Sequence, residues 1–130
     1  MRQRTLFVVA PHSTDPEFRS KMTVVAKVAT DFGMTPVWAH VTANDHRAPP
    51  GFGALEDADI VLADLSFERP SCYFEVGFAQ ALGKRVALIA MDGTAIHQVI
   101  GRDTLIFYNT ISDYENAVRL ALSTPAGQFE

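Results

Sequence analysis

The chain has 130 residues, of which 48% are hydrophobic and 20% are charged, and its formal net charge at pH 7 is −4. This length and composition are typical of one globular domain with its own core. The acidic balance argues against a protein that binds the phosphate backbone of nucleic acids, because such proteins need a basic face. The apolar runs are too short to span a bilayer, and the first residues lack a signal-peptide pattern, so we expect a cytoplasmic protein.

The first half of the chain predicts two strands around one long helix. A β-branched and aromatic run over 5–10 predicts a buried strand. Asp15 is a suitable N-cap for a helix that ends at Gly33. A second strand is expected over 36–41, followed by a loop over 42–53.

The second half continues the alternation of helices and strands. One or two helical turns are expected over 53–57, before a continuous apolar strand over 59–63 that is buried on both faces. The later predicted elements are a helix over 71–82, a strand over 85–91, a short helix over 94–101, a strand over 104–107 and a helix over 112–122. Ser112 and Glu115 have the spacing of a capping box for the last helix.

This alternation predicts an α/β fold, with a parallel sheet and helices on both of its faces. We expect one flavodoxin-like or Rossmann-like doubly wound domain over 1–130, with five strands in the order 2-1-3-4-5. Ligands of such sheets bind at the carboxyl ends of the strands, near the point where the strand order reverses. The residues expected at that edge include Pro11, His12, Ser13, Asp64, Ser66 and Asp92.

Two carboxylates in the middle of the chain are the main chemical candidates. Glu75 stands among apolar neighbours, where desolvation penalises a charged group, so it is either exposed at a helix edge or kept for chemistry. If Ser71 caps the helix, Glu75 comes one residue too late for a capping box. Asp64 ends the third strand, where an acid that caps the next turn is common. Together the two can divide roles, one as nucleophile and the other as acid/base or hydroxyl ligand.

Other polar residues at the predicted edge have a structural and a functional interpretation. The segment PHSTDPEF can hold a phosphate on helix N–H groups with help from Ser13, or it can be an ordinary cap loop without glycines. His12 is either a base or ligand contact, or a solvated loop histidine. Tyr73 either offers its hydroxyl to a substrate or belongs to the core. The single cysteine, Cys72, excludes a disulfide framework, and the four histidines have no metal-site spacing.

The stretch ADIVLADLSFERPSCYFEVGFAQALGKRVALIA, residues 58–90, resembles the nucleoside 2-deoxyribosyltransferase-like superfamily. In that family a strand ends in Asp and a small polar residue. A loop with a proline then leads to an aromatic residue, Glu-hydrophobic-Gly and a Gly-Lys pair. The matching positions are Asp64, Ser66, Pro70, Tyr73, Glu75, Gly77, Ala79, Gly83 and Lys84. The resemblance extends over 5–120 in outline and is specific over 58–90.

This resemblance implies cleavage or transfer at the N-glycosidic bond of nucleosides or nucleoside 5′-monophosphates, with no metal or organic cofactor. It implies that Glu75 is the nucleophile on the anomeric carbon and that Asp64 contacts the sugar or the leaving base. The predicted substrate-binding residues are Pro11, His12, Ser13, Ser66, Ser71, Tyr73 and Asp92. A homodimer or higher homo-oligomer is expected, because transferases of the family often borrow a site residue from a neighbouring subunit.

Two departures from the family pattern keep alternatives open. Ser71 stands where the family often has Asn, and Glu68 and Arg69 stand in place of the extra Asp of the transferases. The second active-site acid of the transferases therefore has no clear counterpart. The alternatives are a non-catalytic nucleotide-binding or sensing module, and an NAD hydrolase related to Toll/interleukin-receptor-like domains.

Overall fold

The structure is a computed structural model that describes residues 3–42 and 52–123. Its centre is a five-stranded sheet in the order β2-β1-β3-β4-β5. The strands are β1 (Arg4–Val9), β2 (Met34–Trp38), β3 (Ile60–Asp64), β4 (Val86–Met91) and β5 (Ile106–Tyr108). Neighbouring strands pair in parallel throughout this sheet. The predicted fold class and strand order are confirmed.

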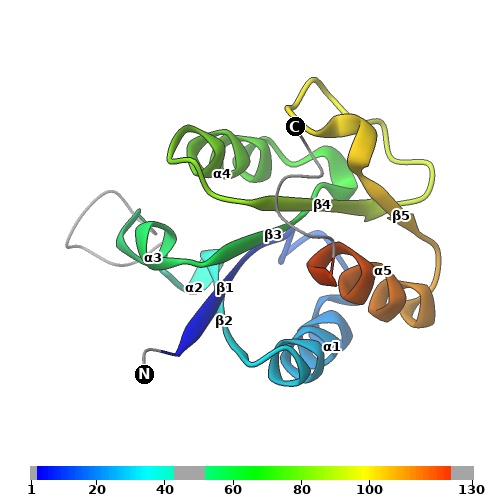
Figure 1. The fold of residues 1–130 in the computed structure, drawn as a ribbon. Helices are drawn as coiled ribbons and strands as arrows, with labels where there is room; N and C mark the ends of the chain where they lie inside the picture. Colours follow the sequence, from blue (N-terminus) through cyan, green and yellow to red (C-terminus); the bar gives the residue numbers. More distant parts are fainter. Residues whose placement is uncertain (1–2, 43–51, 124–130) are drawn as a thin grey trace.

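Helices cover both faces of the sheet. They are α1 (Phe18–Asp31), α2 (Ala39–Thr42), α3 (Phe52–Asp57), α4 (Pro70–Ala81) and α5 (Ile111–Ser123). Figure 1 shows α1 and α5 side by side on one face and α4 on the other. No helix in the described ranges has both the length and the apolar character needed to cross a membrane.

The core is divided by the sheet into two apolar layers, because successive strand residues point to opposite faces. In β1, Leu6 and Val8 face the layer under α1 and α5, whereas Phe7 and Val9 face the layer under α4. All five residues of β3 are buried, as its continuous apolar run predicts.

One predicted strand has different bounds, and one predicted helix is wrong. The second strand ends at Trp38, and α2 follows where the end of that strand was expected. The predicted helix over 94–101 is not a helix. Ile96 and Val99 pack back onto the core under α4 at a spacing of three, which imitates helical periodicity in an irregular segment. The 3-10 turn η2 (Arg102–Thr104) follows, so the fifth strand starts later than expected.

The helix caps also differ from the predicted ones. The last helix begins at Ile111, and the cap is Thr110, whose Oγ1 accepts a 3.2 Å hydrogen bond from Asp113 N–H. Ser112 therefore lies inside the helix. Helix α4 begins at Pro70, which needs no N–H partner at this position, and Arg69 precedes it without a side-chain cap.

At the start of α1, Asp15 lies two residues before the cap position, which Glu17 occupies. Asp15 Oδ1 accepts a 2.9 Å hydrogen bond from Glu17 N–H, and its carbonyl accepts one of 3.2 Å from Phe18 N–H. Asp15 thus forms a turn before the helix and is not its N-cap. Gly33 ends α1 with a φ of 71°, which confirms the predicted stop.

Candidate functional site

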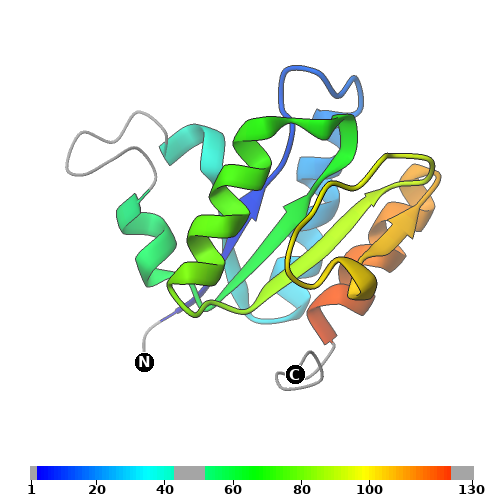
Figure 2. The same cartoon turned by 90° about the horizontal axis from the view of Figure 1, so that it is seen from above.

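The predicted site residues lie at the carboxyl edge of the sheet. Figure 2 shows the loop after β1, the turn between β3 and α4, and the segment after β4 at this one edge. The residues in question are Pro11, His12 and Ser13 after β1, Asp64 and Ser66 at the end of β3, Ser71, Tyr73 and Glu75 in α4, and Asp92 after β4.

Asp64, the last residue of β3, is 2% exposed, and both oxygens of its carboxylate accept hydrogen bonds from groups inside the protein. Its Oδ1 accepts hydrogen bonds from the N–H of Ser66 at 3.0 Å and from the hydroxyl of Ser66 at 2.6 Å. Its Oδ2 accepts a 2.6 Å hydrogen bond from the hydroxyl of Tyr108. Burial raises the pKa of Asp64, while these hydrogen bonds and the charge of Lys21 act in the opposite direction.

Lys21 of α1 is a buried cation that the sequence analysis missed. Its Nζ lies 2.5 Å from Asp15 Oδ2 and 3.9 Å from Asp64 Oδ2. It donates a 2.7 Å hydrogen bond to the hydroxyl of Tyr108, and it sits over the rings of Tyr108 and Tyr114. We call Asp15, Lys21, Asp64, Ser66 and Tyr108 the buried charge cluster. The sequence marks Lys21 as buried only by its position, because it lies on the same face of α1 as the core residues Val25 and Val28.

Ser66 joins the buried charge cluster to a strained turn. Its hydroxyl accepts a 2.8 Å hydrogen bond from Met91 N–H in β4. The next two residues, Phe67 and Glu68, have positive φ angles of 65° and 51°, which non-glycine residues rarely adopt. This turn, η1 (Ser66–Glu68), leads directly into α4. Asp64 and Ser66 therefore fix the point from which the helix carrying Glu75 starts.

Glu75 is the sixth residue of α4 and lies in the second turn, not at the helix start. It is half-buried, and no hydrogen bond or ion pair reaches its side chain from residues 3–42 or 52–123. Burial raises the pKa of Glu75 above its usual value. Helix N–H groups therefore do not hold this carboxylate ionised through hydrogen bonds. What remains is a partly desolvated carboxylate without a partner in the described chain, which is a feature of functional sites.

The thiol of Cys72 is influenced by the charges of both carboxylates, Glu75 and Asp64. Burial, followed by the charges of Glu75 and Asp64, raises the pKa of its thiol to about 12. Both carboxylates are therefore close enough to act on the same buried group. A thiol with this pKa stays protonated at neutral pH, so Cys72 is a structural residue and not a nucleophile.

His12, in the loop after β1, belongs to an aromatic cluster whose other rings come from α1, β2 and α2. The rings of His12 and His40 are stacked with centroids 4.8 Å apart, and Phe18 and Trp38 contact His40 edge-on. His12 is exposed. Burial, and then the charge of His12, lowers the pKa of His40. The sequence analysis missed His40, which lies in the unpredicted helix α2.

The loop after β1 offers few free groups for binding a phosphate. Pro11 is buried and Ser13 is exposed. The N–H groups of Glu17 and Phe18 already donate to Asp15, whose carboxylate lies at the start of α1. A phosphate in this place would rely on Ser13 and would face the charge of Asp15.

Tyr73 and Asp92 face other parts of the edge. The hydroxyl of Tyr73 accepts a 2.9 Å hydrogen bond from His97 N–H, and the two rings are 5.4 Å apart. His97 Nε2 lies 2.9 Å from Glu68 Oε1, so it connects the segment after β4 to η1. Asp92 is exposed, and its N–H donates to the carbonyl of Tyr108 at 2.8 Å. Tyr73 thus has a structural role in addition to any contact with substrate. Ser71 is exposed.

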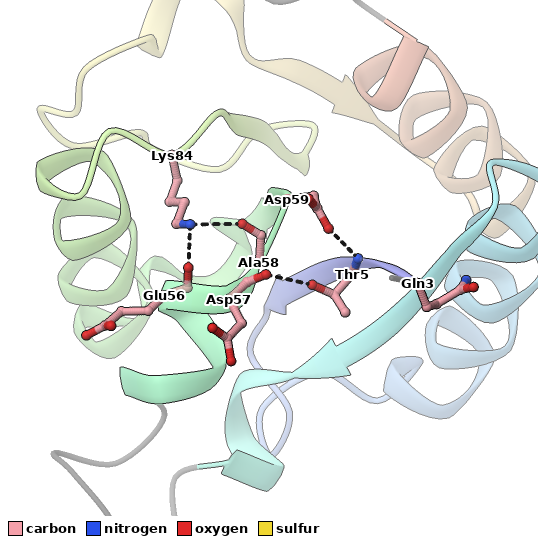
Figure 3. A pocket seen from close by; sticks show the side chains of 7 residues that line it. All are labelled: Gln3, Thr5, Glu56, Asp57, Ala58, Asp59 and Lys84. Atoms are coloured by element: carbon pink, nitrogen blue, oxygen red, sulfur yellow. Dashed lines mark hydrogen bonds between the residues drawn. The ribbon is translucent and has the colours of Figure 1, made fainter. Parts of the chain in front are cut away.

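The opposite edge of the sheet has a hollow of about 580 Å³ (Figure 3), lined by Gln3, Thr5, Glu56, Asp57, Ala58, Asp59 and Lys84. Lys84 Nζ donates hydrogen bonds to the carbonyls of Glu56 and Ala58, at 2.6 and 3.0 Å, and thereby caps the C-terminal end of α3. Asp59 accepts a 2.8 Å hydrogen bond from Thr5 N–H. These contacts hold the start of β1, the end of α3 and the start of β4 together. Within the described residues, no three His, Cys, Asp or Glu side chains come together as a metal-ligand set.

Comparisons with known proteins identify the fold. No family model and no curated protein matches the chain. Among solved structures, the CMP N-glycosidase BcmB of Clostridium botulinum superposes with a TM-score of 0.65 at 17% identity, covering 90% of this chain and 98% of the other. The chain has the nucleoside 2-deoxyribosyltransferase-like fold.

Two 2-deoxyribosyltransferases support this fold assignment. That of Bacillus psychrosaccharolyticus gives a TM-score of 0.58 at 16% identity, covering 86% of this chain and 90% of the other. That of Leishmania mexicana gives 0.55 at 19% identity, covering 77% and 70%. The fold that the resemblance over residues 58–90 implies is confirmed. The roles of individual residues stay predictions.

Proposed function

We propose that this protein cleaves or transfers at the N-glycosidic bond of a nucleoside or nucleoside 5′-monophosphate, with Glu75 as nucleophile. The observation that carries the proposal is Glu75 itself, which is half-buried at the ligand edge and has no partner in the described residues. Burial raises its pKa, as expected for a carboxylate whose hydration is partly removed. The structural neighbours named above act on the same class of bond, which supports this reaction type.

The proposed reaction proceeds in two steps. A carboxylate oxygen of Glu75 attacks the anomeric carbon, the C–N bond breaks, and the base leaves with the bonding electron pair and takes up a proton. Water or an acceptor base then displaces Glu75 from the resulting glycosyl ester. Hydrolysis and transfer differ only in the second nucleophile. Neither step requires a metal or an organic cofactor.

For the substrate, we propose that His12 contacts the base and Ser13 the sugar or its 5′-phosphate. The stacked rings of His12 and His40 offer a flat, partly exposed aromatic surface beside the edge. The carboxylate of Asp15 at the start of α1 counts against tight phosphate binding there. Comparing release rates for a nucleoside and its 5′-monophosphate, in wild type and in Ser13→Ala, tests this point. An equal rate for both substrates in both proteins would assign Ser13 to the loop alone.

We also propose that the protein acts as a homodimer. Phe74, next to Glu75 on α4, is 70% exposed, and Leu82 at the end of the same helix is 40% exposed. A contiguous exposed apolar patch is typical of an interaction surface, and Phe74 adjoins Phe78 on α4 with ring centroids 6.1 Å apart. Sedimentation of wild type and of Phe74→Ser tests the dimer, which should dissociate in the variant. A wild-type protein that sediments as a monomer at micromolar concentration would refute it.

One observation favours a second candidate, a nucleotide-binding module without catalysis. Asp64 is the predicted partner of Glu75, but both of its oxygens are occupied by Ser66 and Tyr108. Contact with a sugar hydroxyl or a base would require one of these hydrogen bonds to be exchanged. If Asp64 does not move, the leaving base has no acid at this position.

A panel of nucleosides, 5′-nucleotides and NAD separates the two candidates. Free base should be released by wild type and by Glu56→Gln, because Glu56 is an exposed acid at the opposite edge of the sheet. Glu75→Gln should release almost none while still binding substrate. Ligand-dependent thermal stabilisation of wild type without release from any compound would establish the binding module in place of the enzyme.

A further inference from the structure

The buried charge cluster contains more charge than a structural core needs. Lys21 is 5% exposed, Asp15 is 7% exposed and Asp64 is 2% exposed. Burying charged groups is expensive, and a buried pair is often no more stable than apolar residues of the same volume. A fold that needed only stability at the α1 position would be served by Leu or Met. The cluster therefore calls for an explanation in terms of the site.

The hydrogen bonds of the cluster converge on Asp64 from both sides and connect α1 to the turn that precedes α4. Lys21 Nζ donates to Tyr108, and the hydroxyl of Tyr108 donates to Asp64 Oδ2. Asp64 Oδ1 accepts from the N–H and the hydroxyl of Ser66, which begins the strained turn η1. The hydroxyl of Ser66 accepts from Met91 N–H. Each donor in this chain points toward the Asp64 carboxylate or holds a group that does.

We propose that Lys21 is a positioning residue for the candidate site. It keeps Asp64 ionised, and through Asp64 and Ser66 it holds η1 and the start of α4, the helix that carries Glu75 in its second turn. The part that concerns Glu75 rests on the proposed function. The part that concerns Asp64 and η1 rests on the contacts alone.

The need for a cation follows from the acceptor count of Asp64. Ionised, its two oxygens accept three hydrogen bonds, from Ser66 and Tyr108. Protonated on Oδ2, Asp64 would become a donor, and its hydrogen bond with the hydroxyl of Tyr108 would have to reverse, with Tyr108 turning its own proton toward Ser66 Oγ at 3.1 Å. Ionisation of Asp64 therefore sets the direction of the hydrogen bonds around Ser66, which precedes the strained residues Phe67 and Glu68.

The groups that face Asp64 come from several elements. Lys21 approaches from α1, Tyr108 from β5 and Ser66 from the turn, while Asp64 also acts on Cys72 of α4 and Tyr114 of α5. Asp15 lies on the far side of Lys21 and adds a second negative charge. Lys21 is the cation that contacts both carboxylates. Its removal should therefore raise the pKa of Asp64 further, since burial already raises it.

The test compares Lys21→Met with Lys27→Met on the same helix, because Lys27 is exposed and pairs with Glu115. Unfolding by urea is measured from pH 4 to pH 9. In Lys21→Met, the loss of stability relative to wild type should be small at pH 4 and should grow as the pH rises, since the folded variant must ionise Asp64 and Asp15 without their shared cation. Tyr108→Phe separates the two carboxylates, because its hydroxyl contacts Asp64 and Lys21 but not Asp15. Lys27→Met loses only an exposed ion pair with Glu115, so its stability should change far less with pH than that of Lys21→Met. A pH-independent loss in Lys21→Met would overturn the proposal.

If Lys21→Met does not fold, Tyr108→Phe replaces it. This variant removes the hydroxyl that connects Lys21 to Asp64 and keeps the ring. The loss of stability of Tyr108→Phe relative to wild type should also grow as the pH rises, but by a smaller amount than in Lys21→Met. A difference from wild type that does not change with pH in this variant would also overturn the proposal.

The positioning role has its own measurement. The positioning role requires Asp64 to be ionised for turnover, in addition to Glu75. The acid limb of base release against pH should therefore move upward by about one unit or more in Lys21→Met, because losing an opposite charge at this range raises the pKa of Asp64. An unmoved limb together with a changed unfolding profile would overturn the positioning role. If wild type releases no base, the proposed function fails. The rate of thiol labelling at Cys72 then reports on the start of α4, and a rate equal to that of Lys27→Met would overturn the positioning role.

Discussion

Tyr108, at the end of β5, donates a 2.6 Å hydrogen bond to Asp64, at the end of β3, across the intervening strand β4. This contact joins two strands that are not neighbours in the sheet. Because it occupies an oxygen of Asp64, it makes that carboxylate a fixed internal acceptor.

Asp64→Asn should change how stability depends on pH. Burial raises the pKa of Asp64, so the folded state of wild type binds a proton more tightly than the unfolded state does. The stability that the folded state gains from this tighter proton binding is fully present below the usual pKa of an aspartate. It is lost as the pH rises through the raised pKa of Asp64. Asn cannot titrate. Urea unfolding of both proteins at a series of pH values should therefore show a decline in wild type that is reduced in the variant, and parallel curves would contradict the assignment.

The same substitution should reduce turnover about 10²-fold or more if Asp64 positions or contacts the reacting groups. Asp103→Asn is a matched control, because Asp103 is an exposed acid in η2. Steady-state rates of base release with each variant decide the matter. Full activity in Asp64→Asn would remove Asp64 from the site.

Ser66→Ala should destabilise the protein by about 2 kcal/mol, the order expected for losing a buried hydrogen bond to a charged acceptor. The hydroxyl of Ser66 contacts both Asp64 and Met91 N–H, and the strained turn η1 follows it. Ser20→Ala, at an exposed position of α1, should change the free energy of unfolding little. Equal stability of the two variants in urea would show that Ser66 does not hold the turn.

Cys72 should be unreactive in the folded protein. Burial and the charges of Glu75 and Asp64 raise the pKa of its thiol to about 12, so the thiolate is scarce at neutral pH. Ellman's reagent should label it slowly in buffer and rapidly in urea. Rapid labelling of the native protein would mean that α4 starts differently from the contacts described above.

The sequence predicted the sheet well because its signals are local. The apolar runs of β1, β3 and β4 and the alternation with helices were enough to set the strand order. The segment over 94–101 was misassigned because Ile96 and Val99 repeat at a helical spacing while packing onto the core without a helix. Its real constraint is the contact of Tyr73 and Glu68 with His97, which no local pattern reveals.

The candidate site was only partly predictable. Asp64, Ser66 and Glu75 stand in a recognisable motif, so their place at the carboxyl edge followed from the strand assignment. Lys21 and Tyr108 come from distant parts of the chain, and a lysine in a helix is usually solvated. Only its position on the core stripe of α1 marked it. The pairing of His12 with His40 depended on α2, which lies where a strand was expected.

The acid limb of the rate profile should report the environment of Glu75. Burial raises the pKa of Glu75, and a nucleophile must be ionised to attack. Base release should therefore fall on acidification at a pH above the usual pKa of glutamate, with the fold intact by circular dichroism. A rate that stays constant down to that usual value would contradict a buried carboxylate nucleophile.

Trapping the glycosyl ester on Glu75 tests the central claim most directly. A 2′-fluorinated nucleoside slows the breakdown of the ester, so wild type should accumulate a sugar adduct. Peptide mass spectrometry should then find the added mass on the peptide that contains Glu75, and Glu75→Gln should carry none. Release of base by wild type without an adduct on this peptide, or normal turnover by Glu75→Gln, would contradict the assignment of Glu75 as the nucleophile.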